Sequence, residues 1–382
     1  MNILIVIEKN SWMNTHLANT LESMGHAVTR FYYSDSVNEF YGLKRRKERI
    51  KKNIDLLNTA KALQHRHTLD LIFCYIYDDF LFRKYAKALS NLNIPMVNYN
   101  VDMAFHWYRQ IRIAKYFDIM LCAQKENMRN LARYAKKVFY FPMAACPPQP
   151  NDFSTQQKKE YELTFTGTEF PYRRRILSEV IKSSLPLLIF GKCWGSNESN
   201  VYTHSIQKTL HYILFYAWSR FRAGELKSLW EVLLNRFHCA AKKKENISIS
   251  KKFIRGGLST NNLSTVFRNS KINIGLSRYA NNDVNMPGHC QMRLRDFEVP
   301  MIGGFYLVEK SPGYDQAFID GKEVVMWKTL PELLEKIRYY LKHADERESI
   351  AAAGQRRALT EHTWETRFKM LFSELGLQNM RF

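Results

Sequence analysis

The chain has 382 residues, of which 46% are hydrophobic and 14% aromatic, and its formal net charge is +21. This length and apolar content exclude a disordered chain and predict two α/β domains, each with a core of its own. The charge predicts an acidic partner, and a nucleotide sugar, an anionic membrane, an anionic polysaccharide and nucleic acid all meet that description.

The amino-terminal run from Ile3 to Ile7 is too short for a signal peptide and predicts a first buried strand. No stretch offers about 18 uninterrupted apolar residues, so no membrane-spanning helix is predicted. The six cysteines form no CxxC pair and no zinc-type spacing, which is typical of reduced thiols in a cytosolic protein. We therefore expect a cytoplasmic protein whose contact with a membrane, if it has one, is peripheral at the inner face.

Residues 1–150 predict a Rossmann-like domain in which buried strands alternate with polar loops and helices. The strands are expected at residues 3–7, 27–32, 69–77, 94–99, 118–123 and 138–141. The first loop has no GxGxxG motif, so no dinucleotide site is predicted there. The Pro-rich run at residues 141–150 and the polar stretch behind it predict the domain boundary.

Polar side chains follow two of these strands. Asp102 and His106 come just after the strand at 94–99, where ligands meet parallel sheets, so both are candidate catalytic residues. The alternative interpretation is a helix cap beside a surface histidine. Asp78 and Asp79 end another strand, and adjacent carboxylates before a helix are most often N-terminal caps, so no metal site is predicted.

Two basic segments, 42–53 and 205–244, are candidates for contact with an anionic membrane surface. For the first, a solvated helix face is the alternative. The second lies within residues 196–246, whose apolar positions recur at helical spacing and predict two amphipathic helices. Such helices either pack on the body of the protein or lie in a membrane interface.

The second domain is expected from residue 151, with strands at 162–166, 187–190 and 247–249 and a helix at 261–269. Gly167 follows the first of these strands, and Arg173 and Arg174 enter the next helix. A glycine turn and arginines at a helix N-terminus suit a pyrophosphate, because free N–H groups and the helix dipole favour an anion. Lys192 follows the second strand at the same edge.

Residues 271–308 predict a strand at 272–276, a polar loop, a helix that opens near Gln291, a glycine turn and a strand at 305–308. The loop and helix carry Arg293, Arg295 and Glu298, beside Gly303 and Gly304, which allow a ligand to approach the backbone closely. This combination predicts a nucleotide pocket at the carboxyl ends of the strands.

The last third of the chain resembles the CgeB-like (spore-maturation-type) glycosyltransferases in the order and spacing of its motifs. The matching motifs are Arg295-Asp296-Phe297-Glu298, Gly303-Gly304-Phe305 and residues 320–325, 332–341, 346–347, 351–354 and 361–363. The resemblance implies the GT-B fold, in which two Rossmann-like domains face a cleft. The acceptor domain would be 1–150, the nucleotide-sugar domain 151–360, and a helix in 361–382 would cross back to the first domain. The helical insertion at 196–246 departs from the family pattern.

The resemblance also implies the reaction. A bacterial glycosyltransferase would move a sugar from a nucleoside diphosphate to a cell-surface glycan or a lipid-linked acceptor, without a metal and with no cofactor beyond the nucleotide sugar. Basic groups and backbone N–H groups would then neutralise the departing diphosphate. The expected donor-binding residues are Gly167, Arg173, Arg174, Lys192, Arg278, Arg295, Glu298, Gly303 and Gly304.

Several points stay open at this stage. Glu298 matches the family glutamate that accepts hydrogen bonds from ribose, and a helix carboxylate paired with Arg295 or Arg293 is the alternative. The family's usual second acidic residue falls at Cys290 and is absent, so neither retention nor inversion is predicted; inversion would need a base, for which Asp102 or His106 is the candidate. Nucleic acid as acceptor and a non-catalytic binding module are the alternative functions.

Overall fold

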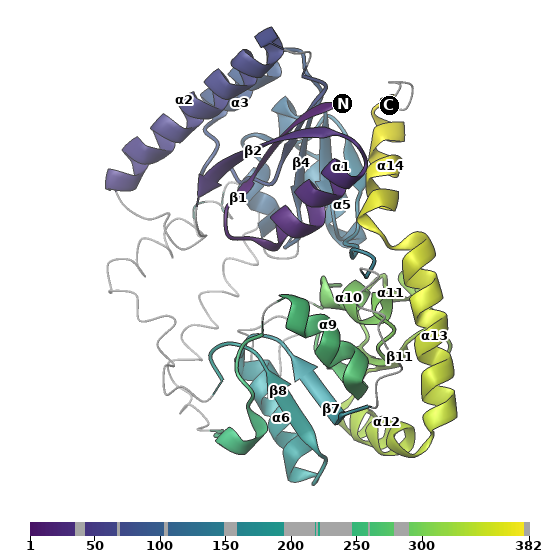
Figure 1. Cartoon of the computed structure of the whole chain (residues 1–382). Helices are drawn as coiled ribbons and strands as arrows, with labels where there is room; N and C mark the ends of the chain where they lie inside the picture. The colour runs from purple at the N-terminus through teal and green to yellow at the C-terminus, as the bar shows by residue number, and fades with distance from the viewer. Residues whose placement is uncertain are drawn as a thin grey trace. The chain divides into compact units, whose positions relative to one another are not determined.

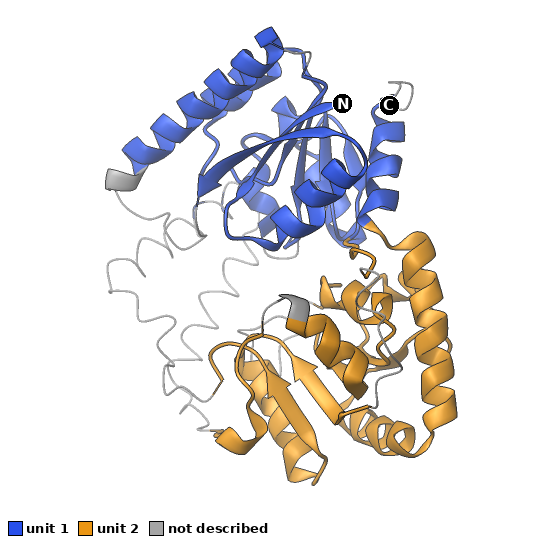
Figure 2. Cartoon of the chain, viewed as in Figure 1, with its two compact units in different colours: residues 1–142, 204–236, 364–382 blue, residues 143–203, 237–363 orange. Residues whose placement is uncertain are grey.

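The computed structural model describes residues 1–34, 43–66, 69–102, 106–148, 159–194, 218, 221, 247–258, 260–278 and 290–377. The chain divides into two compact units (Figure 2), and we describe each by itself. Unit 1 comprises residues 1–142, 204–236 and 364–382, and unit 2 comprises residues 143–203 and 237–363. The predicted domain boundary near residue 150 and, apart from Trp218 and Phe221, the predicted insertion helices lie outside the described residues.

Unit 1 is built on a six-stranded sheet in which every strand pairs in parallel with its neighbours. Its order is β2 (Ala27–Ser34), β1 (Asn2–Glu8), β3 (Leu71–Cys74), β4 (Met96–Asn100), β5 (Ile119–Cys122) and β6 (Val138–Tyr140). β3, β5 and the interior of β1 are continuous apolar runs, which is the pattern expected where helices cover both faces of a parallel sheet.

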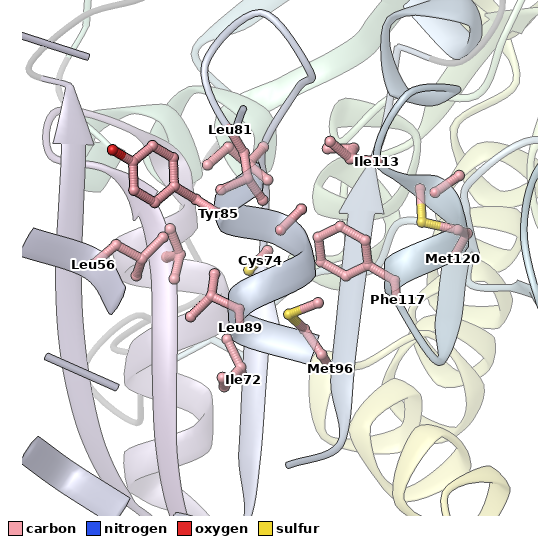
Figure 3. Packing of buried hydrophobic residues seen from close by; sticks show 14 of the residues in the cluster. Leu56, Ile72, Cys74, Leu81, Tyr85, Leu89, Met96, Ile113, Phe117 and Met120 are labelled. Carbon is pink, nitrogen blue, oxygen red and sulfur yellow. The ribbon is translucent and has the colours of Figure 1, made fainter. Parts of the chain in front are cut away.

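Short and long helices connect these strands (Figure 1). They are η1 (Asn14–Ala18, a π-helix), α1 (Asn19–Ser23), α2 (Leu43–Arg66), α3 (Arg83–Ser90), the 3₁₀ helices η3 (Trp107–Gln110) and η4 (Ala114–Tyr116), and α5 (Lys125–Ala132). The carboxyl-terminal helix α14 (Trp364–Glu374) also belongs to unit 1, where it packs against α1. Figure 3 shows the core beneath α3, where Tyr85 and Leu89 meet Ile72 of β3, Met96 of β4 and Leu56 of α2.

Unit 2 contains a five-stranded parallel sheet in the order β11 (Val325–Trp327), β10 (Tyr306–Glu309), β9 (Ser270–Gly275), β7 (Tyr161–Thr166) and β8 (Leu187–Phe190). Its helices are α6 (Pro171–Lys182), η7 (Lys251–Phe253, 3₁₀), α9 (Thr260–Asn269), α10 (Arg295–Met301), α11 (Tyr314–Ala317), α12 (Leu330–Lys342) and α13 (Ala344–Glu361). The prediction of two α/β domains with parallel sheets is therefore confirmed.

Two local predictions for unit 2 were wrong. Residues 247–250 form no strand, because the free edge of β8 is reached instead by Ile254, in an isolated parallel bridge to Ile189. The helix expected to open near Gln291 begins at Arg295, because the side chain of Asp296 accepts a hydrogen bond from the backbone of Arg293 and holds the preceding turn.

Each sheet has one place where the chain reverses its direction of strand addition. In unit 1 the chain adds β2 on one side of β1 and β3 on the other, and in unit 2 it adds β8 and β9 on opposite sides of β7. Ligands of open parallel sheets bind at the carboxyl ends of the strands that flank such a switch point. The β1/β3 and β7/β9 positions are therefore where sites are expected. None of the helices in the described part of the chain is long and apolar enough to cross a bilayer.

Candidate functional site

Four arginines gather around the carboxyl edge of the unit 2 sheet, beside its switch point. Arg173 lies on α6, which follows β7, and Arg278 follows β9. Arg295 is the first residue of α10, and Arg293 lies in the turn just before it. The first turn of α6 begins with Pro171 and has no side-chain cap, so the N-terminus of this twelve-residue helix keeps its affinity for an anion.

Arg173 is the most deeply buried of the four, with 7% of its surface exposed. Its Nη1 and Nη2 donate to the carbonyls of Thr168 (2.8 Å) and Leu276 (3.4 Å), so it ties the β7 loop to the β9 loop. Burial, together with the positive charges of Arg293 and Arg295, lowers the pKa of the Arg173 guanidinium to about 9. The guanidinium stays charged at neutral pH. A bound anion would offset the repulsion between it and the neighbouring arginines.

Arg278 is held by Glu309, the last residue of β10, whose carboxylate is 1% exposed. The Nε of Arg278 donates to Oε1 of Glu309 at 3.0 Å, and the backbone N–H groups of Ser277 and Arg278 both donate to Oε2 at 3.1 Å. Tyr172, on α6, donates its hydroxyl to Oε1 at 2.6 Å. Glu309 therefore joins the ends of β9 and β10 to the first turn of α6.

Arg293 lies beside Arg278, and Asp296 lies beside Arg293. The guanidinium of Arg293 donates to the carbonyls of Ser277 and Arg278 at 3.3–3.4 Å. Asp296 accepts hydrogen bonds from the backbone of Arg293 (2.7 Å) and from the hydroxyl of Tyr306 (2.8 Å). Burial raises the pKa of the Asp296 carboxyl to about 6, although these hydrogen bonds oppose the rise. Asp296 thus fixes the turn that carries the arginines.

Arg295 and Glu298 pair with each other on the first turn of α10, three residues apart. The guanidinium of Arg295 also lies over the ring of Phe267 on α9, 5.3 Å from its centroid. Both side chains are only partly buried, at 32% and 15% exposed. The alternative that the sequence left open, a helix carboxylate paired with Arg295, is the arrangement found, and it leaves one face of the pair accessible.

The other predicted donor-binding residues lie further from this cluster or act through the backbone. Arg174 pairs with Glu169 and donates to the carbonyl of Ile247 at 2.8 Å. Lys192 lies with its stem beside Gly257. In the described part of the chain, no contact joins the side chain of Arg174 or Lys192 to the four arginines.

The predicted glycines shape the edge. A Cβ at Gly167 would lie 2.9 Å from Nη1 of Arg173, so glycine makes room for that guanidinium. Gly303 has a φ of +78° and ends α10 in a left-handed turn, as glycine readily does. A Cβ at Gly304 would lie 2.9 Å from the carbonyl oxygen of Phe267, so this glycine brings α9 close.

Several buried polar atoms at this edge have no hydrogen-bond partner among the described residues. They are Nε of Arg173 and the hydroxyl oxygens of Thr166, Ser277 and Ser311, which follow or end β7, β9 and β10. Buried polar groups normally find a partner. These atoms are therefore available to a ligand at the β7/β9 switch point.

At the carboxyl edge of unit 1 the structure places Asp102 and His106 close together. The backbone N–H of His106 donates to the carbonyl of Asp102 at 2.9 Å, and the imidazole lies 6.0 Å from the ring of Tyr77. The helix that follows Asp78 and Asp79, α3, has Phe82 at its N-cap position and no capping side chain, which corrects the prediction. Asp78 accepts a hydrogen bond from the backbone of Arg112, at 3.2 Å, and Asp79 forms a buried ion pair.

Sequence reasoning missed Glu309 and the positions of Ser277 and Ser311. Glu309 is the last residue of an apolar strand, YLVE, and the sequence pattern predicts that a loop starts there. The signal that could have found it is a carboxylate in the last position of a buried parallel strand, where its side chain reaches the ligand edge.

Residues 222–373 match a family described as glycosyl transferase-like. No curated protein matches the chain in sequence.

Solved structures match nearly the whole chain at low identity. Sucrose-phosphate synthase from Thermosynechococcus elongatus is 11% identical with a TM-score of 0.57, over 98% of this chain and 99% of that one. Anabaena HepE in complex with UDP-glucose is 13% identical with a TM-score of 0.57, again over 98% and 99%. The lipopolysaccharide outer core galactosyltransferase WaaB is 10% identical with a TM-score of 0.54, over 98% and 99%. The chain therefore has the fold of the GT-B glycosyltransferases, and its carboxyl-terminal part matches a glycosyl transferase-like family.

Proposed function

We propose that this protein transfers a sugar from a nucleoside diphosphate sugar to a cell-surface glycan or a lipid-linked acceptor, and that it belongs with the CgeB-like enzymes. The observation that carries the proposal is the cluster of Arg173, Arg278, Arg293 and Arg295 at the β7/β9 switch point. Its positive charge is only partly matched by Asp296, Glu298 and Glu309.

The chemistry of the transfer explains why such a cluster is useful. As the sugar leaves, negative charge grows on the diphosphate, and fixed positive groups stabilise that charge without rearranging. Arg173 and Arg278 are held in place by hydrogen bonds to the loops after β7 and β9 and to Glu309. Guanidinium groups pair well with phosphate oxygens. We therefore propose that the reaction needs no metal.

Glu298 is proposed to bind the ribose of the donor. Its side chain is 15% exposed, and a carboxylate has acceptor sites beyond those used in its ion pair with Arg295. Anabaena HepE, a structure of similar fold, is described in complex with UDP-glucose, which supports a nucleotide sugar as donor.

An anionic membrane surface is the proposed location of the acceptor. The outer face of α2 exposes Arg46, Lys47, Lys51, Lys52, Lys61 and Arg66. Each basic residue near an anionic bilayer contributes roughly 1 kcal/mol. In the basic segment 205–244, Trp218 and Phe221 stack at 5.8 Å and are 58% and 54% exposed, as suits a membrane interface.

Co-sedimentation with lipid vesicles tests this location. We expect binding to vesicles that contain phosphatidylglycerol and none to pure phosphatidylcholine. The combined change Arg46→Gln, Lys47→Gln and Lys51→Gln should weaken binding at least tenfold, because it removes three of the exposed charges. Equal binding to both vesicle types, or no loss in the variant, would refute a charge-driven contact through α2.

Turnover tests the reaction itself. The wild type is incubated with UDP-, GDP-, dTDP- and CMP-sugars in the presence of EDTA, and release of free nucleotide is followed with a bacterial lipid extract as acceptor. Release from one donor class, reduced at least a hundredfold by Arg173→Gln and unchanged by Arg338→Gln on the exposed face of α12, is the expected result. Nucleotide binding without turnover would instead identify a binding module, and transfer to nucleic acid would replace the proposed acceptor.

A further inference from the structure

A second polar cluster lies at the carboxyl edge of the unit 1 sheet, around a carboxylate that does not stand out in the sequence. Glu8 is the last residue of β1 and is 8% exposed. The hydroxyl of Tyr33, on β2, donates to its Oε1 at 3.2 Å. This is the side-chain hydrogen bond that Glu8 accepts in the described part of the chain. A carboxylate can accept several hydrogen bonds, so Glu8 keeps acceptor capacity for a donor from a ligand.

Asp79 is a second buried carboxylate, and one of its oxygens lacks a donor among the residues that the structure describes. Its Oδ2 forms an ion pair with Nη2 of Arg109 at 2.7 Å, and both side chains are more than nine-tenths buried. Its Oδ1 is buried and has no partner in the described part of the chain. The guanidinium of Arg109 also lies over the ring of Tyr77, 4.0 Å from the centroid, and its charge acts on Glu8. The charge of Arg109 therefore stabilises two buried carboxylates, those of Asp79 and Glu8.

The topology brings these groups to one place. Glu8 ends β1, whereas Tyr77 and Asp79 follow β3, and β1 and β3 flank the switch point of the unit 1 sheet. That is the position at which open parallel sheets bind ligands. The cluster is thus the unit 1 counterpart of the arginine cluster in unit 2, and its chemistry is different.

The mixture of groups selects a class of ligand. The positive charge of Arg109 opposes a cation, and the carboxylates of Glu8 and Asp79 oppose an anion. Oδ1 of Asp79 and the remaining acceptor capacity of Glu8 favour a ligand with hydrogen-bond donors, and the ring of Tyr77 offers an apolar surface. Sugar hydroxyls donate hydrogen bonds, and the C–H face of a sugar ring packs on aromatic rings.

We propose that this cluster binds a neutral sugar unit, with Glu8 accepting a hydrogen bond from one of its hydroxyls and Asp79 from another. The inference rests on the proposed function, because the sugar bound here would be the terminal unit of the acceptor. Glu8, which no sequence motif indicated, is then the residue that recognises the acceptor.

The site has a defined pH dependence. The groups that act on Glu8 are Tyr33 from β2 and Arg109 from η3. Tyr77 and Asp79, from the segment after β3, act in turn on Tyr33. Burial raises the pKa of Glu8, while the Tyr33 hydroxyl and the charge of Arg109 oppose the rise. A protonated carboxyl loses the charge-assisted hydrogen bond, so sugar affinity should fall as the pH is lowered through this raised pKa.

Saturation-transfer NMR of the full chain, with no nucleotide present, tests the proposal. The probes are the methyl α- and β-glycosides of glucose, galactose, mannose and N-acetylglucosamine. Glu8→Gln keeps an acceptor for Tyr33 but removes the charge, and Glu22→Gln, at an exposed carboxylate on α1, is the matched control. We expect at least one glycoside to bind the wild type and the control, with a dissociation constant at least tenfold higher for Glu8→Gln and no pH dependence in that variant.

Thermal shift with UDP, run on the same samples, separates this inference from the proposed function. Sugar binding that depends on Glu8 supports the inference whether or not UDP binds. If no glycoside binds the wild type, or if Glu8→Gln binds as tightly as the control, the sugar site is refuted, even where UDP stabilises all three proteins. A variant that fails to unfold cooperatively is replaced by Tyr33→Phe, for which we expect a threefold or greater loss of affinity; unchanged affinity would refute the site.

Discussion

At the scale of single residues, the notable feature of unit 2 is charge placed where water hardly reaches it. Arg173, Asp296 and Glu309 have 7%, 1% and 1% of their surface exposed. Burying a charge is unfavourable unless partners surround it, and here the partners are backbone groups, tyrosine hydroxyls and one another. Side chains kept charged in such a place are typical of a site that handles a charged ligand.

Asp296 gives a prediction about pH and stability. Because burial raises its pKa from 3.8 to about 6, the folded protein binds this proton more tightly than the unfolded chain does. The associated stabilisation, about 3 kcal/mol, is complete below pH 3.8 and is lost as the pH rises through 6. The Asp296→Asn variant has no carboxyl group to titrate at this position. The melting temperature of the wild type minus that of the variant should therefore fall between pH 4 and pH 7, and a constant difference would contradict the assignment.

At this scale, a site residue could be predicted from the sequence only where the features that define its role lie near it in the chain. Arg173 and Arg295 could be identified because each begins a helix behind a strand and a loop. Glu8 and Glu309 could not, because each simply ends an apolar run, and the partners that define their roles, Tyr33 and Arg278, are 25 and 31 residues away.

At the scale of elements, the loops after β7 and β8 are packed backbone to backbone. A Cβ at Gly191 would lie 2.0 Å from the carbonyl oxygen of Gly167, and the indole N–H of Trp194 donates to that same oxygen at 2.8 Å. The glycines are thus needed for the two loops to meet, and the β7 loop in turn holds Arg173 through Thr168.

Gly191→Ala should separate these loops. We expect a loss of about 1–3 kcal/mol or more in the free energy of unfolding, because the added methyl meets backbone that cannot move aside. The control is Gly257→Ala, whose Cβ would meet only the flexible stem of Lys192 at 3.2 Å and should change stability by less than about 0.5 kcal/mol. Urea denaturation of both variants measures the difference, and equal stabilities would show that the loops can separate freely.

The strands themselves were predictable, because continuous apolar runs bounded by polar loops mark buried parallel strands. The failure at residues 247–249 has a physical reason. The run Ile247-Ser-Ile-Ser alternates as an edge strand does, but the pairing groups of β8 are taken by Arg255 and its neighbour Ile254. Which of two nearby segments pairs with an edge depends on loop geometry that a sequence pattern does not contain.

At the scale of the whole molecule, the chain returns to its first unit at the end. Trp364, the first residue of α14, has no exposed surface; it stacks on Trp12 at 5.7 Å and its indole N–H donates to Nδ1 of His16 at 3.2 Å. Phe368 packs nearby against Phe73 of β3. Unit 1 is therefore completed by residues more than 200 positions beyond its last strand.

Trp364→Ala should destabilise unit 1 by about 3–5 kcal/mol, because it removes a fully buried indole from the junction of α14 and η1. Met370→Ala, at a side chain of the same helix that is 44% exposed, should change stability by less than about 0.5 kcal/mol. Hydrogen exchange of β1 and β3 locates the effect. Protection in these strands that is equal in the two variants would mean that α14 contributes little to unit 1.

The central claim is that the arginine cluster at the β7/β9 switch point binds a nucleoside diphosphate. Isothermal titration calorimetry of UDP, GDP, dTDP and CDP with the wild type, Arg173→Gln and Arg338→Gln tests it most directly. We predict that one diphosphate binds the wild type and Arg338→Gln with equal affinity, and that Arg173→Gln weakens binding at least tenfold, since it loses a charge-assisted contact. Binding that is unchanged in Arg173→Gln, or absent for every diphosphate in the folded wild type, would contradict the claim.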